Sequence, residues 1–492
     1  MSTASYDLTQ KLIPFLDRHL ILPLLAHLSE AELFPAEHIA RAQYELVKET
    51  NMLDYAASLF ESAYPDEEVP GGEFGVGCLQ DNDGNTSMFF PDNGMALAPQ
   101  IFAAKREKAV SESERLQQEA QIVLDVIEKP EVAQALRQDK MQNLQYLKDN
   151  YKLTLEQISA LYNFGQFQYT TGNYSGASDY LYHFRILSTN PDLLLSAHWG
   201  KLASDILTGA WDRALEELSS LRETLDSRSG PAQSLTSTSS APLTARAWLL
   251  HWSLFVCINK NVPSGPQTFL EMALAPAYLN TIQVSCPWLL RYVSAAAVLV
   301  GRHRDDVVRV VQMESYQYSD PVTRFLTALY VDFDFEGARE ALGAAGDVLE
   351  GDFFLGAYAP EFVDAARCLI SEAYCRVHHT INIEQLSDRL NMSRDEGEKW
   401  IVNLIRDTKM GTDAKIDLKK NEIHIARAHV PVYQTIIEKT RGLAFRTQVL
   451  GVAMGKRAAG EEVETSNAGK RGDKRRVGGG ARREREEKTE AA

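Results

Sequence analysis

The side chains best suited to chemistry in this 492-residue chain lie in one short stretch, where Cys375 is followed by His378 and His379. A Cys-x-x-His pair can supply two ligands to a zinc ion, but a structural zinc site needs four, and no second pair follows. Cys368 lies seven residues before Cys375, two turns along one helix face, which is typical of small core residues. The sequence therefore predicts no metal site and no cofactor.

Motifs for catalysis or nucleotide binding are also weak or missing. The segment GGEFGVG (71–77) is rich in glycine, but no Gly-Lys-Ser/Thr follows it, so we do not expect a phosphate-binding loop. The sequence contains no Gly-x-Ser-x-Gly elbow and no His-Glu-x-x-His zinc motif. Acidic pairs such as Asp305 and Asp306 are expected on solvated helix faces. We therefore predict that the protein is not an enzyme.

The net charge and the cysteines narrow the classes of protein to which the chain could belong. The net charge of −16 argues against a general nucleic-acid binder, because phosphate contacts need clustered Lys and Arg. The five cysteines are scattered and odd in number, which fits a reducing compartment. The N-terminal residues lack a secretory-signal pattern, and no long uncharged apolar run predicts a membrane span. We expect a cytoplasmic protein with no membrane partner.

Helical periodicity dominates the first half of the chain. Residues 1–64 are expected to form N-terminal helices, and Pro14 and Pro23 are interpreted as breaks between them. Residues 65–100 are rich in Gly, Pro, Asp and Asn and are predicted to form an inserted surface loop. Helical periodicity resumes at residue 101. The predicted apolar face of the N-terminal helices comprises Leu12, Phe15, Leu16, Leu20, Leu24 and Leu28.

A repeat with a period of 37 residues lies within 101–225. Its pattern is aromatic-x-x-Ala-x-x-x-Leu, and it occurs once more at Phe335, Ala338 and Leu342. The equivalent pairs are Tyr162 and Trp199, Gly172 and Gly209, Tyr174 and Trp211, Ala177 and Ala214, and Leu181 and Leu218. This period predicts tetratricopeptide-like helix–turn–helix units that bury their apolar faces against one another as an all-α solenoid.

The second half of the chain changes character several times. Residues 226–244 are rich in Ser, Thr, Pro and Gly and are predicted to form a linker. Residues 245–380 are predicted to form a second apolar helical block, followed by a winged helix at 381–430. One more amphipathic helix is expected at 431–452. Residues 453–492 lack apolar periodicity and are predicted to be a disordered tail.

The winged helix is expected to contact protein rather than DNA. Its two helices surround the turn NMS, where Ser393 and Glu396 have the spacing of a capping box, and Trp400 is expected in the core. The segments AKIDL and EIHIA then alternate as a hairpin. Asp395, Glu396 and Glu398 near the start of the second helix would repel phosphates. An edge strand of the hairpin instead offers backbone groups to a neighbouring protein.

A helical solenoid followed by a winged helix and a terminal helix resembles the PCI-domain family, which builds the proteasome lid, the COP9 signalosome and eukaryotic translation initiation factor 3. A narrower resemblance, to the E-subunit family of that factor in its fungal form, covers residues 5–64 and 101–452. The loop 65–100 and the tail differ from animal members. The blocks that carry the resemblance are YDLTQKLIPFLDRHLILPLL, FQYTTGNYSGASDYLYHFR, WGKLASDIL, WLLHWSLFV, LNMSRDEGEKWIVNLIRDTKMGTDAKIDLKKNEI and YQTIIEKTRGLAFRTQ.

The resemblance implies a non-catalytic scaffold subunit whose complex binds the small (40S) ribosomal subunit and promotes recruitment of mRNA and initiator methionyl-tRNA. Its partners would be the other subunits and the small ribosomal subunit, with mRNA contacted indirectly or weakly and DNA not at all. The wing would be Lys415–Leu418 with Glu422–Ile425, and the bundle helix Tyr433–Leu450. The implied interface residues are Ile416, Leu418, Ile423, Ile425, Tyr433, Ile436, Ile437 and Leu443.

Two alternatives remain open from the sequence. A PCI scaffold subunit of the proteasome lid or COP9 signalosome would have the same fold, and only the sequence blocks argue against it. A winged-helix nucleic-acid-binding regulator would need basic residues on the second helix, and that helix has three acidic residues near its start instead.

Overall fold

The computed structural model consists mainly of α-helices. It describes residues 6–31, 34–63, 99–127, 149–151, 154–228, 241–378, 380–384, 387, 399–400, 414–417, 422–425 and 432–458.

Four helices and one 3-10 turn form the N-terminal segment. They are α1 (Thr9–Leu12), η2 (Ile13–Phe15), α2 (Arg18–Glu30), α3 (Ala36–Val47) and α4 (Leu53–Ala63).

The predicted apolar face of this segment is confirmed, since its leucines are at most 8% exposed and Phe15 is half-buried. The interpretation of Pro23 as a break is wrong, because Pro23 lies inside α2. A proline there removes one backbone hydrogen bond, but buried neighbours such as Leu20 and Leu24 hold the helix in place.

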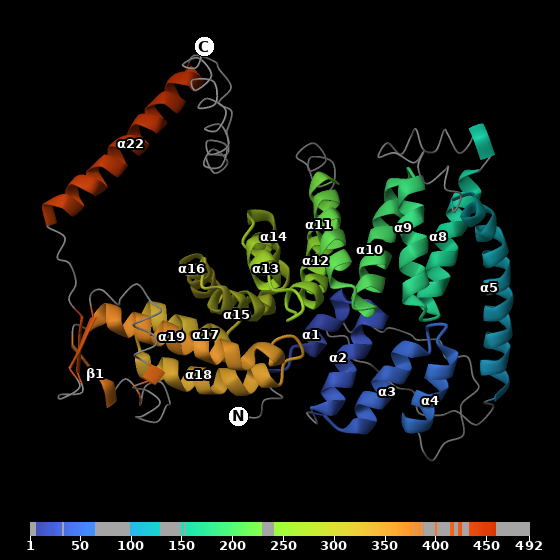
Figure 1. The fold of residues 1–492 in the computed structure, drawn as a ribbon, viewed down its shortest axis with the longest axis horizontal. Helices are drawn as coiled ribbons and strands as arrows, with labels where there is room; N and C mark the ends of the chain where they lie inside the picture. Colours follow the sequence, from blue (N-terminus) through green and yellow to red (C-terminus); the bar gives the residue numbers. More distant parts are fainter. Residues whose placement is uncertain are drawn as a thin grey trace, which may run out of the picture. The chain divides into compact units, whose positions relative to one another are not determined.

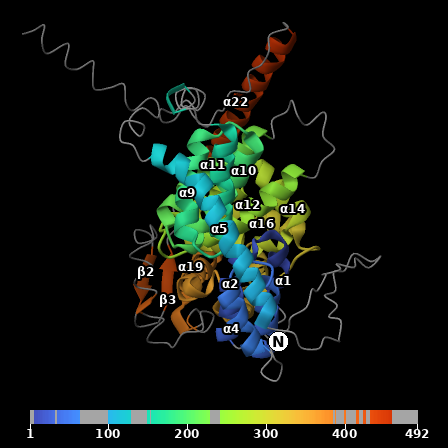
Figure 2. The same cartoon turned by 90° about the vertical axis from the view of Figure 1, so that its right-hand side faces the viewer.

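The repeat region is a row of antiparallel helices. It contains α8 (Leu155–Thr170), α9 (Tyr174–Leu187), α10 (Pro191–Leu207) and α11 (Trp211–Arg228), each packed against the next. Figure 1 shows these helices side by side. The long helix α5 (Pro99–Ile127) packs against α8 and also reaches α4, and Figure 2 shows it crossing the repeat helices.

The predicted 37-residue repeat is confirmed. Gly172 closes the turn from α8 to α9 and Gly209 the turn from α10 to α11, with backbone φ angles of 90° and 73°. A side chain is strained at such angles, which explains glycine at both positions. The equivalent small and apolar residues are at most 3% exposed: Ala177, Leu181, Ala214 and Leu218.

A second helical block follows. It contains α12 (Ala241–Cys257), α13 (Gly265–Ala273), α14 (Pro276–Ser285), η3 (Pro287–Leu289), α15 (Leu290–Val300), α16 (Arg304–Glu314), α17 (Pro321–Thr327), η4 (Ala328–Asp332), α18 (Phe335–Glu350), η5 (Gly356–Tyr358) and α19 (Ala359–Val377).

The junction between the two helical regions differs from the predicted linker at 226–244. Helix α11 continues to Arg228 and α12 already begins at Ala241, while residues 229–240 lie outside the described part. Pro242 in the first turn of α12 is tolerated because the amide hydrogens there have no partner within the helix. The two helices pack directly against each other, so the repeats and the second block are neighbours in one compact unit.

Three short strands form one sheet. They are β1 (Thr380–Asn382), β2 (Ala414–Asp417) and β3 (Glu422–Ile425), in the order β1-β3-β2. The hairpin of β2 and β3 was predicted, but the pairing of β3 with β1 was not. The predicted helix–turn–helix of the winged helix, with Ser393 and Glu396, lies almost entirely outside the described residues.

A long helix, α22 (Val432–Ala458), closes the described part of the chain and extends past the predicted end at residue 452. Residues 459–492 and most of the predicted loop at 65–100 lie outside it. Among the described helices no single one is long and apolar enough to cross a membrane. One bent pair, Pro276–Ser285 with Pro287–Val300, meets that test by length and composition only, at an angle of 117°.

Candidate subunit interface

Of the residues considered first for metal chemistry, Cys375 lies in the packed helix α19 and His378 follows its last residue. Cys375 is buried in α19, and the ring of His378 stands 4.1 Å from the ring of Tyr374. His379 lies outside the described residues. Among the residues that are described, no group of three His, Cys, Asp or Glu side chains is arranged to hold a metal ion. Burial raises the pKa of the thiols of Cys257 and Cys286 to about 12, so both are poor nucleophiles.

A buried charged cluster joins three repeat helices. Lys201 Nζ donates hydrogen bonds to Asp205 (2.9 Å) and Glu217 (3.1 Å), and Arg185 Nη1 donates to Glu217 (2.7 Å). Burial alone would raise the pKa of Glu217, but the hydrogen bond from His198 and the charges of Lys201 and Arg185 lower it to about 2. These groups satisfy one another inside the solenoid, so the cluster fixes the relation of α9, α10 and α11.

A second buried cluster surrounds Arg291 in α15. Its guanidinium donates to the carboxylate of Asp320, to Asp352 (3.2 Å) and to the backbone carbonyl of Tyr6 (2.7 Å). The hydroxyl of Tyr292 also donates to Asp352 (3.1 Å). Arg291 and Asp320 are at most 2% exposed, so this cluster too is structural rather than accessible to a substrate.

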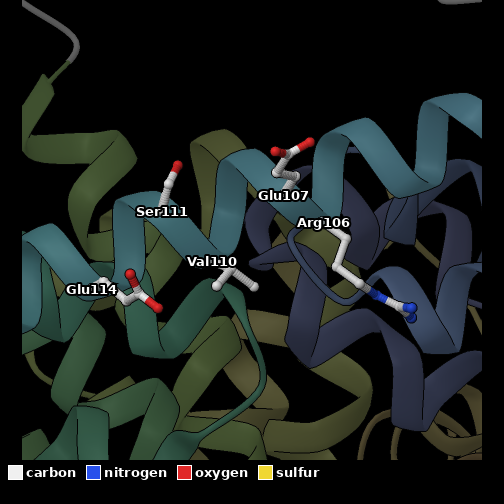
Figure 3. Close-up of a pocket in the computed structure, with 5 residues that line it drawn as sticks. All are labelled: Arg106, Glu107, Val110, Ser111 and Glu114. Carbon is white, nitrogen blue, oxygen red and sulfur yellow. The ribbon is translucent and has the colours of Figure 1, made fainter.

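A surface hollow beside α5 does not form a catalytic site. Its lining residues all come from one helix (Figure 3). They are Arg106, Glu107, Val110, Ser111 and Glu114. Arg106 is paired with Asp54 of α4. Side chains on a single helix face cannot surround a reacting group, so the hollow supports no reaction.

Helix α22 has a different character, because none of its described residues is buried. Its large apolar side chains are between 51% and 80% exposed: Val432, Tyr433, Ile436, Ile437, Leu443, Phe445, Val449, Leu450, Val452 and Met454. Scattered exposed apolar residues are ordinary, but this density on a single helix makes α22 the candidate surface for binding another protein. The four candidates predicted here, Tyr433, Ile436, Ile437 and Leu443, are all exposed.

Five of these residues, together with two threonines, follow a seven-residue pattern along one side of α22. We call this side the seam: Tyr433, Ile436, Thr440, Leu443, Thr447, Leu450 and Met454. The two threonines fit it because their hydroxyls donate to the carbonyls of Ile436 (2.7 Å) and Leu443 (3.0 Å) within the helix. Each hydroxyl is thereby satisfied, and the seam has the spacing of a helix-pairing surface.

The face opposite the seam changes halfway along the helix. In the first half it is polar, with Gln434, Glu438 and Arg441. In the second half three apolar residues take its place, and we call them the opposite face: Phe445, Val449 and Val452. The sequence prediction missed these three residues, although their spacing of four and three residues is a helical signal. The second half of α22 is therefore apolar on both sides.

The interface candidates predicted in the hairpin differ from one another in burial and in how much of each residue is described. Ile423 in β3 is 2% exposed, so its side chain contributes to the fold of this chain. Ile416 and Ile425 lie in β2 and β3, but their side chains, like all of Leu418, are outside the described part. Strand β3 lies between β1 and β2, so only the two outer strands have an unpaired edge within this sheet.

Comparisons with known proteins agree with this architecture. The model of the "eIF3 subunit 6 N terminal domain" matches residues 7–75 and 91–168. The "PCI domain" model matches residues 347–426. A model of the C-terminal part of the E subunit of eukaryotic translation initiation factor 3 matches residues 431–451, which are nearly all in α22.

Fungal proteins named as the E subunit of eukaryotic translation initiation factor 3 are similar over almost the whole chain. The protein of Mycosarcoma maydis is 45% identical, covering 96% of this chain and 90% of the relative. The protein of Cryptococcus neoformans var. neoformans is 47% identical over 92% of this chain and 93% of the relative. The Aspergillus niger protein is 43% identical with the same coverage. This chain therefore belongs to the E-subunit family of eukaryotic translation initiation factor 3.

Proposed function

We propose that this initiation factor 3 subunit is a non-catalytic scaffold, and that α22 is the helix by which it joins the other subunits. In the assembled complex it supports binding to the small (40S) ribosomal subunit and recruitment of mRNA and initiator methionyl-tRNA in the cytoplasm. The observation that carries the proposal is the exposed apolar surface of α22. Membership of the family supports partnership with the other subunits.

Energetics favour a helical partner for α22. Burying one large apolar side chain contributes about 1.5–3 kcal/mol, so the seam and the opposite face together can supply substantial binding free energy. Helices alone in water gain little stability from propensity, and most of it comes from packing an apolar face. Because its second half is apolar on two sides, we propose that at least two partner helices enclose that half.

The charge of α22 indicates what flanks those partner helices. The helix carries five Lys or Arg residues and one Glu, although the whole chain has a net charge of −16. Acidic residues beside the apolar stripes of the partners would complement this charge and fix the register of pairing. The first half of α22 keeps a polar face and would lie at the rim of such a bundle.

The sheet supplies a second contact in this proposal. Strand β2 lies at one edge of the order β1-β3-β2, so its outer backbone groups can pair with a strand of a neighbouring subunit. Since β3 is central, Ile423 and Ile425 are assigned to holding the sheet together. Ile416 and Leu418 remain the proposed contacts, and the winged helix at 381–430 remains a proposed docking module.

Affinity purification of the tagged full-length protein tests the role of α22. Placing acidic residues in the seam, with Leu443→Asp and Leu450→Asp, should abolish recovery of the other initiation factor 3 subunits and of small ribosomal subunits. The matched control, Gln434→Asp with Thr435→Asp, adds the same charge to the polar side of the helix and should retain both. Normal recovery with the seam variant, or recovery of proteasome-lid subunits in place of initiation factors, would contradict the proposal.

A further inference from the structure

The first described helices contact both the repeats and the second helical block. We call residues 6–30 the strap. On the side of the repeats, the hydroxyl of Tyr169 in α8 donates to the Asp17 carboxylate (2.6 Å). Asp17 also caps α2 by accepting from the backbone amide of His19 (3.0 Å), and the His19 ring bonds the hydroxyl of Tyr174 in α9 (3.0 Å). The start of α2 is thus bound to the α8–α9 turn.

The part of the strap before Asp17 is bound by the second block, largely through its backbone. The indole of Trp252 in α12 donates to the carbonyl of Phe15 (3.0 Å), and Arg291 in α15 donates to the carbonyl of Tyr6 (2.7 Å). The ring of Phe15 stacks on His251 at 4.4 Å with 6° between the planes. Trp252 is 3% exposed, so this contact is closed to water.

Trp252 stands at the junction of three parts of the chain. Besides its bond to the strap, its ring meets that of Trp199 in the repeat helix α10 at 4.8 Å, edge to face. All leucines of the strap except Leu22 are at most 8% exposed, so the strap also contributes to the core. Residues 6–15 of the strap are therefore bound to the second block and residues 17–19 to the repeats, and farther along α2 the ring of His27 meets that of Phe353 in the second block.

We infer that residues 6–30 are a strap that fixes the repeat helices against the second block. Its two coupled anchors are the hydrogen bond between Tyr169 and Asp17 and the hydrogen bond between Trp252 and Phe15. Contacts that are independent contribute additively to stability, whereas contacts that share an ordered element are coupled. Loosening one anchor should therefore loosen helices at the other. This conformational device lies within one chain and does not depend on the proposed role in assembly.

Hydrogen–deuterium exchange of the full-length protein tests the coupling with two single variants, their double variant and one control. Tyr169→Phe and Trp252→Phe each remove one donor to the strap and keep an aromatic ring. Loss of one hydrogen bond corresponds to a change of up to about tenfold in the opening equilibrium. We expect Tyr169→Phe to speed exchange by several-fold (~10-fold at most) in α12 as well as in α8. Trp252→Phe should do the same in the last turn of α8.

Tyr162→Phe is the matched control, because Tyr162 also lies in α8 but its hydroxyl bonds Ser196 (2.7 Å) and not the strap. It should change exchange only near α8 and α10. The double variant combines Tyr169→Phe with Trp252→Phe. If Tyr169→Phe speeds exchange only around α8, and the double variant shows the product of two independent local effects, the two anchors are not coupled and the inference is wrong. Should Trp252→Phe fail to fold, exchange of α12 in Tyr169→Phe decides the question alone.

Discussion

Two helices of this chain, α15 and α22, differ sharply in how far their side chains are buried. In α15 nearly every residue is buried, and even the charge of Arg291 is neutralised by Asp320 and Asp352 inside the same chain. In α22 no described residue is buried, and large apolar side chains such as Tyr433 and Met454 are 80% and 71% exposed. The side chains of the first helix are covered within one chain, and we propose that those of the second are covered by a partner.

Because of this difference, we expect folding stability to depend on α15 and assembly with other subunits to depend on α22. Changes around α15 should unfold the protein whether or not partners are present, because buried groups lose partners within the chain. Changes in the seam or opposite face of α22 should leave the isolated protein folded and remove its partners. A variant in either region that lowers folding stability and partner binding to the same extent would contradict this distinction, on which the proposed function depends.

The largest expected effect is that of Arg291→Ala. It leaves the Asp320 carboxylate, which is 1% exposed, without its cation and should lower the free energy of unfolding by about 3–5 kcal/mol. Chemical denaturation measures this change. Arg309→Ala is the control, since Arg309 is an exposed arginine 3.7 Å from Asp306, and its loss should cost less than about 1 kcal/mol. Equal effects of the two changes would refute the special role of the buried cluster.

The second effect is a dependence of stability on pH. The His251 ring donates from Nδ1 to the Ala247 carbonyl (2.6 Å) and accepts at Nε2 from Trp288 (3.1 Å), so it is neutral when folded. Burial lowers its pKa from 6.5 to about 4. The unfolded chain therefore binds a proton first as pH falls, and stability is lost between pH 6.5 and 4.

The loss due to His251 amounts to about 3 kcal/mol at most. Denaturation midpoints measured across pH 6.5–4 should fall, and His251→Gln should make that decline shallower. Burial also lowers the pKa of His19, so some decline remains in the variant. An unchanged slope in His251→Gln would contradict a neutral, buried His251.

The third effect concerns the opposite face of α22. Phe445→Ala removes a side chain that we expect to be buried only in the complex, and should weaken partner binding by about 2 kcal/mol. The free energy of unfolding of the isolated protein should change by less than about 0.5 kcal/mol. Titration with purified partner subunits measures the first quantity. Unchanged affinity would mean that partners contact the seam alone.

The smallest effect is that of Thr447→Val in the seam. The hydroxyl of Thr447 already donates to Leu443 within the helix, so we expect its replacement by a methyl group to preserve partner binding within about 0.5 kcal/mol. Thr447→Asp, of comparable size but charged, should abolish binding. If Thr447→Val itself loses binding, the hydroxyl contacts the partner and the seam is not purely apolar.

Much of the architecture could be predicted, because the residues that pack the repeat recur at a fixed spacing in the sequence. Gly172 and Ala177 recur at equivalent positions 37 residues later, and both keep their predicted roles. Strand β1 was missed because three residues, Thr380–Asn382, are too short to show alternation. Pro23 was misinterpreted because tertiary packing overrides a local signal.

The exposed apolar surface of α22 was predicted in part for similar reasons. The seam residues Tyr433 and Leu443 follow a regular spacing, whereas Phe445 and Val449 occupy only half of the opposite face and form a shorter pattern. The Arg291 cluster could not be predicted at all, since its partners lie far away in sequence and only the fold brings them together.

The most direct test of the account compares hydrogen–deuterium exchange in the isolated protein and in the assembled initiation factor 3 complex. We predict that amides of α22 exchange rapidly in the isolated chain and become strongly protected in the complex, most of all between residues 443 and 454. Amides of α15 should be equally protected in both. Protection of α22 in the isolated chain, or its continued rapid exchange in the complex, would contradict the assignment of α22 as the assembly helix.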